Sequence, residues 1–395
     1  MTISTVALPY FVILFILYLI ERKNHKCLYA TGKDNTHLLR SAYFILLIFS
    51  GLRGFVYTDF ASYYPFYEMI GDLKDLPYVF LVKGWEPGFI IYTYLCKLLV
   101  PNYFAWNFIS TAIDLSLLYV FLKRYSPNQL LSLMIFFVMG FTALEFNVLR
   151  NAKAIFIFLI SIKYIEERNL LKYSFAILLA FMFHTSAIFY WPLYFILNKR
   201  IPKKILWVVF VAGLIILLFN IHILPESLIN YMSFITEDSD RFSRLSEHLS
   251  NEGESKISIG MIERIITYLL VMKTYDNKMF QAKNRYIFSN MYVLFFIVWF
   301  YFSNMGTALQ RFNYMFIPCY WILYPSWIEC NRVNFPQGQM LISRKLAHNI
   351  RLFIIAFLFL RTMVMGDGNL KYENVLTGAS TFEQRMEYLD RQWDR

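Results

Sequence analysis

Charged residues are scarce in this chain of 395 residues: Asp, Glu, Lys and Arg together make up only 16% of it. A soluble domain of this length typically carries about 25% charged residues. Hydrophobic residues make up 58% of the sequence, and its mean hydropathy is +0.44. This composition excludes an ordinary soluble enzyme and predicts an integral membrane protein. The net charge of +11 is then expected in cytoplasmic loops, where basic residues set topology, and no nucleic-acid partner is expected.

Sequence signals for disulfides, metals and nucleotides are also missing. The four cysteines, Cys27, Cys96, Cys319 and Cys330, form no CxxC and no Cys/His cluster, so we expect neither a disulfide nor a metal centre. No P-loop, GxGxxG or HExxH motif occurs, and we expect no cofactor. The first apolar run, residues 3–20, lacks a basic n-region and an A-x-A cleavage site, so it is expected to be a retained helix.

Apolar runs predict an all-α polytopic membrane protein, with a single integral membrane domain over residues 1–395. A spanning helix needs about 20 apolar residues, although shorter runs can cross inside a bundle. The short runs 170–183 and 186–197 could instead form one long helix, or a broken pair that does not fully cross. Residues 88–100 are shorter still, and Pro101 stops them, so they predict a re-entrant or interfacial helix. The candidate spans number about twelve, within a range of about 10–13: 3–20, 38–53, 104–122, 129–148, 152–166, 170–183, 186–197, 204–222, 258–272, 287–303, 312–329 and 350–365.

Basic residues orient these spans. With the amino terminus outside, the inner connections hold Lys and Arg at about three times the density of the outer stretches, as the positive-inside rule requires. Both termini are therefore predicted on the outer side. The outer segments are then a loop over 54–88, a polar loop over 223–257 and a C-terminal tail over 366–395. The loop 223–257 could form short amphipathic helices over a cavity or remain without a catalytic part.

Three arginines fall on this outer side, against the topological preference. Arg53 closes one apolar run in "GLRG", Arg150 lies between two runs in "VLRNAK", and Arg311 begins a run in "LQRFNY". Each alone could be an interfacial arginine whose charged end reaches water. At a helix start, Arg311 is also opposed by the helix dipole. Together they suggest an anionic partner, and the planar guanidinium suits phosphate.

Two acids lie in the predicted outer loop 54–88. Asp59 follows "FVYT" and precedes several tyrosines, including Tyr63, while Glu86 lies beside Trp85 in "GWEPGF". Either acid alone could simply be solvated. Aromatic side chains beside carboxylates are typical of a sugar-binding cleft and also of a membrane interface.

Two further ionisable residues lie inside apolar runs. His184, in "LAFMFHTSA", is the only histidine in such a run, and it could make a helix-packing hydrogen bond or take part in chemistry. Asp114 could be the structural partner of an arginine or part of a cavity. Both alternatives stay open at this point.

The order of these motifs resembles the EpsG-like branch of bacterial polysaccharide polymerases, which are relatives in function of the Wzy-type O-antigen polymerases. The similar segments are "LRG…DFASYYPFY", "WEPGF", "LRNAKAIFIFLISIKYIEERN…YSFAILLAFMFHTSAIFYWPLYFI" and "RFNYMF", and they cover roughly residues 40–330. The most specific piece pairs R-x-x-x-A with "LAFMFHTSA". Thr58 and Phe60 depart from the family's pattern, which tends to have Gly before the acid and Tyr after it. The resemblance carries over Arg53, Asp59, Glu86, Arg150, His184 and Arg311.

The resemblance implies a multispanning enzyme of the bacterial cytoplasmic membrane whose active site faces the outer side. It would join oligosaccharide repeat units carried on undecaprenyl pyrophosphate, for O-antigen, capsule or exopolysaccharide. The expected partners are a lipid-linked donor, a lipid-linked acceptor and the bilayer, and a chain-length regulator protein is a further candidate. On electrostatic grounds, the three arginines would hold pyrophosphate, with no metal required.

A base must also accept the proton of the acceptor hydroxyl. We expect Asp59 to be this base, with Glu86 and His184 as rivals, and Tyr63 and Trp85 to contact sugar. A single displacement with one base predicts inversion at the anomeric carbon.

Three other membrane proteins would share some of these features. An O-antigen ligase would use the same lipid carrier, and a flippase or transporter would bind the same lipid-linked unit. No convincing internal repeat supports a transporter. A membrane-bound O-acyltransferase could also use a histidine in an apolar setting, although its acyl donor is expected to approach from the cytoplasm.

Overall fold

The computed structural model of the protein describes residues 5–31, 34–219, 221, 223, 259–276, 286–302, 312–333, 355–357, 359–360 and 370–393. Within these ranges the chain is helical, and β-pairing is limited to one isolated antiparallel bridge between Arg53 and Asn374. The prediction of an all-α protein is thereby confirmed for the described residues.

The described residues form two compact units, one from residues 1–194 and 324–395 and the other from 195–323. The first unit holds α1 (Leu8–Thr31), α2 (Thr36–Gly51), α3 (Phe60–Met69), α4 (Leu76–Lys83), α5 (Pro87–Leu99), α6 (Tyr103–Tyr125), α7 (Gln129–Val138), α8 (Leu149–Glu166), α9 (Leu170–Phe181) and α20 (Phe382–Trp393). The second holds α11 (Lys203–Leu218), α14 (Ile259–Thr274) and α16 (Ile287–Tyr301). Two helices, α10 (Leu193–Ile196) and α18 (Pro318–Val333), cross the boundaries between the units.

Asparagine side chains cap the N-termini of four helices in the first unit. Asn35, Asn102, Asn128 and Asn169 precede α2, α6, α7 and α9, and each accepts hydrogen bonds from backbone N–H groups of the first turn. These N–H groups have no partner within the helix, so a capping oxygen stabilises the helix start.

Two of the predicted spans are interrupted. In the run 129–148, α7 ends at Val138, Gly140 adopts φ 126°, and a short π-helix follows over Ala143–Asn147. In the run 186–197, a 3₁₀-helix, η4 (Thr185–Tyr190), precedes the four-residue α10. Pro192 between them lacks a backbone N–H, which disfavours one continuous helix.

One described helix, α6, is by itself long and apolar enough to cross a membrane. Its 23 residues correspond to about 34 Å, close to the thickness of the hydrocarbon core. Shorter apolar helices include α2, α5, α7, α9 and α16. The number of spans and the position of the termini stay predictions.

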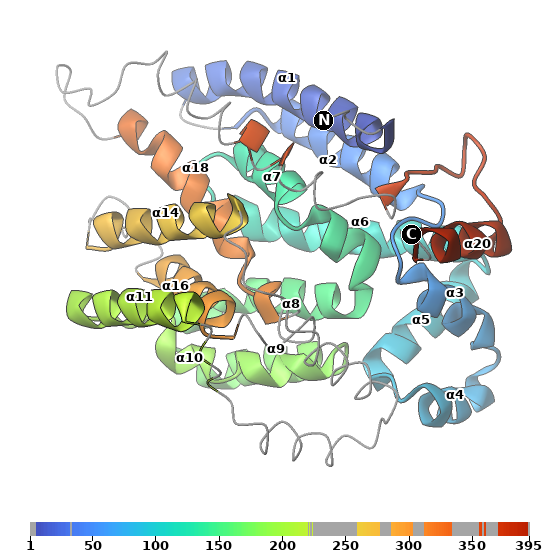
Figure 1. Cartoon of the computed structure of the whole chain (residues 1–395). Coiled ribbons are helices and arrows are strands. Elements are labelled where there is room, and N and C mark those ends of the chain that lie inside the picture. The colour runs from blue at the N-terminus through green and yellow to red at the C-terminus, as the bar shows by residue number, and fades with distance from the viewer. Residues whose placement is uncertain are drawn as a thin grey trace. The chain divides into compact units, whose positions relative to one another are not determined.

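The candidate site residues gather at one end of the first unit. Arg53, just after α2, reaches Asn107 near the start of α6, and Ser186, just after α9, reaches Asn151 near the start of α8. Figure 1 shows α3, α4, α5 and α20 together at one end of the helices of this unit. The predicted loop 54–88 is thus largely helical, and the predicted tail 366–395 ends in α20.

Candidate active site

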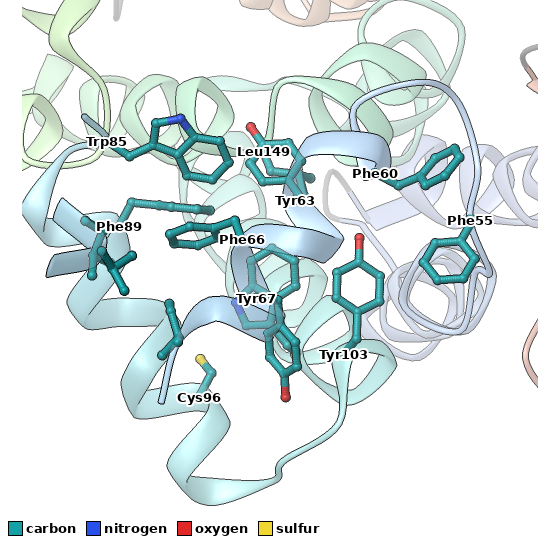
Figure 2. Packing of buried hydrophobic residues seen from close by; sticks show 14 of the residues in the cluster. Phe55, Phe60, Tyr63, Phe66, Tyr67, Trp85, Phe89, Cys96, Tyr103 and Leu149 are labelled. Atoms are coloured by element: carbon teal, nitrogen blue, oxygen red, sulfur yellow. The ribbon is translucent and has the colours of Figure 1, made fainter. Parts of the chain in front are cut away.

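Aromatic side chains from α3, α5 and the start of α6 form a buried cluster beside the candidate site (Figure 2). The ring of Trp85 lies 4.3 Å from that of Phe66 and 5.3 Å from that of Tyr63, measured between ring centroids. Trp85 is 6% exposed and Tyr63 is 4% exposed. These two predicted sugar contacts are therefore largely packed within the cluster, and little of their surface is open to a ligand.

Arg53 is buried at the end of α2. Its Nη1 donates to the carbonyl oxygen of Ser50 at 2.7 Å and to Thr111 Oγ1 at 3.2 Å, and its Nη2 donates to Asn107 Oδ1 at 3.2 Å. Its guanidinium carbon also lies 5.3 Å from the centre of the Phe146 ring. All of these contacts are to neutral groups.

A small pocket of about 10 Å³, room for about one water molecule, adjoins this guanidinium, and its lining includes Arg53, Gly54, Tyr63 and Asn107. No salt bridge joins Arg53 to a carboxylate among the described residues, although Glu145 lies nearby: Ser50 Oγ is 3.5 Å from both Glu145 Oε2 and Arg53 Nη1. A buried charge is costly unless it is paired. The arrangement therefore favours binding of an anion in the pocket.

Glu86 and Arg150 form an ion pair beside this pocket. Arg150 Nη1 donates to Glu86 Oε2 at 2.7 Å, and the backbone N–H of Thr185 donates to Glu86 Oε1 at 2.9 Å. The guanidinium carbon of Arg150 lies 4.2 Å from the centre of the Trp85 ring, and its backbone N–H donates to the hydroxyl of Tyr63. One carboxylate thus joins the starts of α5 and α8 to the chain after α9.

The protonation of Glu86 and Tyr63 follows from these contacts. Burial raises the pKa of Glu86, but the charge of Arg150 and the N–H of Thr185 lower it by a larger amount. The pKa of Glu86 therefore lies below its ordinary value. Burial raises the pKa of Tyr63 to about 12. Near neutral pH, Glu86 is therefore an ionised carboxylate with both oxygens engaged, while Tyr63 is a neutral phenol.

His184 lies two residues from Ser186 in the turn that follows α9. Its Nδ1 accepts from the backbone N–H of Ser186 at 3.2 Å and lies 2.7 Å from that residue's hydroxyl. A neutral imidazole in this arrangement carries its proton on Nε2. Since His184 adjoins Thr185, the histidine and Glu86 belong to one polar group.

Asp59 stands at the start of α3, half-buried, two residues after the strained backbone of Tyr57, which adopts φ 71°. The backbone N–H of Asp59 donates to Asn147 Oδ1 at 3.2 Å, and Thr58 Oγ1 donates to the same oxygen at 3.1 Å. Positive φ in a residue with a bulky side chain is uncommon and costs about 1–3 kcal/mol. The amide of Asn147 holds this strained turn against the π-helix.

The structure thus brings most of the predicted residues into one region. Glu86, Arg150 and His184 lie around Thr185, and Tyr63 links this group to the pocket of Arg53 because it lines that pocket and bonds to Arg150. Arg311 lies outside the described residues.

A buried lysine that the sequence analysis did not single out, Lys153, lies in the same unit as the partner of Asp114. Lys153, one turn after Arg150 in α8, donates to Ser110 Oγ at 2.6 Å and forms an ion pair with Asp114 in α6. The side chains of both partners are nearly inaccessible. Asp114 therefore has a structural cation partner, which is a lysine rather than an arginine. The three-residue spacing from Arg150 to Lys153, on one helical face, was the available signal.

Comparison with known proteins gives one match. The model of the EpsG family matches residues 37–374, which is most of the chain and extends beyond the similarity expected over roughly 40–330. No curated protein and no solved structure matches the chain.

Proposed function

This chain belongs to the EpsG family, which is associated with polysaccharide polymerases, and from this premise we propose that it joins oligosaccharide repeat units carried on undecaprenyl pyrophosphate. The reaction takes place at the outer face of the bacterial cytoplasmic membrane. The product is an O-antigen, capsule or exopolysaccharide chain.

The observation that carries this proposal is the buried guanidinium of Arg53 beside a pocket. Its hydrogen-bond acceptors are neutral, and no carboxylate among the described residues forms a salt bridge with it, which supports a contact with an anion. In glycosyl transfer from a pyrophosphate carrier, negative charge grows on the departing pyrophosphate. A fixed cation that is already oriented stabilises this charge in the transition state without reorganisation. We assign Arg53 to the donor pyrophosphate, with Arg311 as a further candidate contact.

The proposed step is a single displacement. A hydroxyl of the acceptor unit attacks the anomeric carbon of the growing chain, a glycosidic bond forms, and the bond from that carbon to pyrophosphate breaks. Undecaprenyl pyrophosphate leaves, and the hydroxyl proton passes to a base. The attack inverts the configuration of the anomeric carbon.

Asp59 is the base that we favour over Glu86. Glu86 has a lowered pKa and both oxygens occupied, which makes it a weak proton acceptor, and its contacts suit the positioning of Arg150. Asp59 lies at the start of a helix on a strained turn, a setting common near active sites. His184 is the rival base through Nδ1, the nitrogen without a proton, which would first have to leave its contacts with Ser186.

The decisive experiment deletes the gene and separates surface glycans by size. Loss of a polymerase leaves single repeat units, and wild-type protein should restore the ladder of glycan chain lengths. An Arg53→Ala protein present at normal levels should not restore it, whereas Lys97→Gln, on α5 away from the pocket, should. Long lipid-linked chains in the deletion strain would instead indicate a ligase, and a persistent ladder of normal length would reject the proposal.

A further inference from the structure

We infer that the C-terminal segment, residues 370–393, is a working part of the anion site, because it fixes the backbone that carries Arg53. This inference rests on the proposed role of Arg53 as a pyrophosphate contact. It assigns a positioning function to residues about 320 positions away in the sequence.

The segment pairs with the chain on both sides of Arg53. The N–H of Val375 donates to the carbonyl of Leu52 at 2.9 Å, and the N–H of Gly54 donates to the carbonyl of Glu373 at 2.8 Å. Arg53 and Asn374 form the antiparallel bridge between these two bonds. The last carbonyl groups of a helix lack partners within it. Here the C-terminal segment supplies partners just where α2 has ended, and it sets the direction in which Arg53 leaves the helix.

Tyrosine contacts anchor the start of this segment to α1 and α2. The ring of Tyr372 stacks on Phe49 with centroids 4.3 Å apart, and its hydroxyl donates to the carbonyl of Phe49 at 2.7 Å. The hydroxyl of Tyr10 donates to the carbonyl of Leu370 at 2.9 Å. These bonds hold the segment in register with α2.

The rest of the segment folds back and covers the aromatic cluster. The carboxylate of Glu373 accepts from both the N–H and the hydroxyl of Ser380 at 2.9 Å and lies 3.6 Å from Arg385 in α20. The ring of Phe382 stacks on Tyr64 at 4.8 Å. We call this segment, residues 370–393, the C-terminal clamp. The matched family region ends at Asn374, so it includes the bridging residue but not α20.

Glycine at position 54 permits this close approach. A Cβ atom there would lie 2.9 Å from Cβ of Ala379 and 3.2 Å from Cβ of Glu373. A Gly54→Ala change therefore pushes the segment away, and because Gly54 also lines the pocket of Arg53, the added methyl could also fill part of that pocket. The second change Ala379→Gly removes the tighter of the two contacts but keeps the methyl at position 54. It should restore the pairing, and recovery of binding would show that the loss came from displacement of the segment and not from filling of the pocket.

The test measures thermal stabilisation of the purified full-length protein by inorganic pyrophosphate. We expect Gly54→Ala to need about tenfold more pyrophosphate than wild type, the scale of a lost hydrogen bond to a charged group, and the Ala379→Gly double variant to recover most of this loss. Leu376→Ala, which truncates a side chain 74% exposed on the same segment, is the matched control and should match wild type.

An Arg53→Lys change separates positioning from general damage. If the clamp acts through Arg53, this change weakens pyrophosphate binding less in the Gly54→Ala background than in wild type. Equal losses in both backgrounds, or a folded Gly54→Ala protein that binds like wild type, would overturn the inference. If Gly54→Ala does not fold, Tyr372→Phe removes the hydroxyl that donates to the carbonyl of Phe49 and accepts from Asn374 Nδ2. An unchanged pyrophosphate concentration for half-maximal stabilisation in that variant would also overturn the inference.

Failure of the proposed function gives a different result. A wild-type protein that does not respond to pyrophosphate would reject both the role of Arg53 and the clamp. A responsive wild type with an equally responsive Gly54→Ala protein would reject the clamp alone.

Discussion

Replacing Glu86 by glutamine tests whether this carboxylate positions Arg150 or accepts a proton in the reaction. The change keeps an oxygen that can accept from Thr185 but removes the negative charge 2.7 Å from Arg150. Loss of one partner from a fully buried pair costs about 3–5 kcal/mol. Here the Arg150 side chain is 15% exposed and lies against the Trp85 ring, which offsets part of the loss. We expect a destabilisation on the order of 2 kcal/mol.

The pH dependence of stability has a defined sign. The pKa of folded Glu86 lies below its ordinary value, because the lowering by Arg150 and Thr185 exceeds the raising by burial. The pair therefore stabilises the fold at pH values above the unfolded pKa of about 4.3, and this contribution is lost as pH falls through the lower, folded pKa. Between neutral pH and pH values below about 4, the melting temperature of wild type should fall more than that of Glu86→Gln.

The assay combines melting of the purified protein in lipid nanodiscs with glycan ladders from a complemented deletion strain. A positioning role predicts a lower melting temperature at pH 7 and a shortened ladder that is not abolished. Glu68→Gln, at an exposed position on α3, is the matched control and should change neither. Complete loss of the ladder with an unchanged melting temperature would refute this reasoning and identify Glu86 as the base.

Three other substitutions test the site and its support. Asp59→Asn should lower the polymerisation rate by about a hundredfold or more without changing the melting temperature, and a normal rate would reject Asp59 as the base. Gly88→Ala would place a Cβ 2.6 Å from the carbonyl oxygen of Met182, so a loss of about 1–3 kcal/mol is expected, and an unchanged melting temperature would contradict this close approach. Lys153→Met leaves Asp114 buried without its cation and should cost about 3–5 kcal/mol, while adding Asp114→Leu should recover most of it; additive losses would argue against the ion pair.

The individual polar residues of the site could be selected from the sequence, but their pairing could not. Arg53 and Arg150 are conspicuous because they interrupt or end apolar runs, and Glu86 because it lies in a turn with Trp85. The bond between Glu86 and Arg150 joins residues 64 positions apart. Nothing in the local sequence distinguishes an acid that pairs with an arginine from one that faces solvent, because that depends on which helix ends lie together.

The C-terminal segment shows the same limit for the backbone. Asn374 lies in a short polar stretch, and hydropathy predicts only an outer tail for residues 366–395. Its pairing with the chain around Arg53 uses backbone N–H and carbonyl groups, and every residue except proline carries both. Apart from the glycine at position 54, which the approach requires, side-chain patterns therefore do not indicate this contact.

The helical class, the apolar runs and the ionisable residues among them can be inferred from the sequence, because burial of apolar surface and the cost of isolated charges act on each segment locally. Which of these charges form ion pairs depends on the packing of helices that are distant in the sequence. The tertiary structure pairs Glu86 with Arg150 and Asp114 with Lys153, and it surrounds Arg53 with neutral acceptors. That distinction comes from packing between distant helices, and it makes Arg53 the residue on which the proposed chemistry depends.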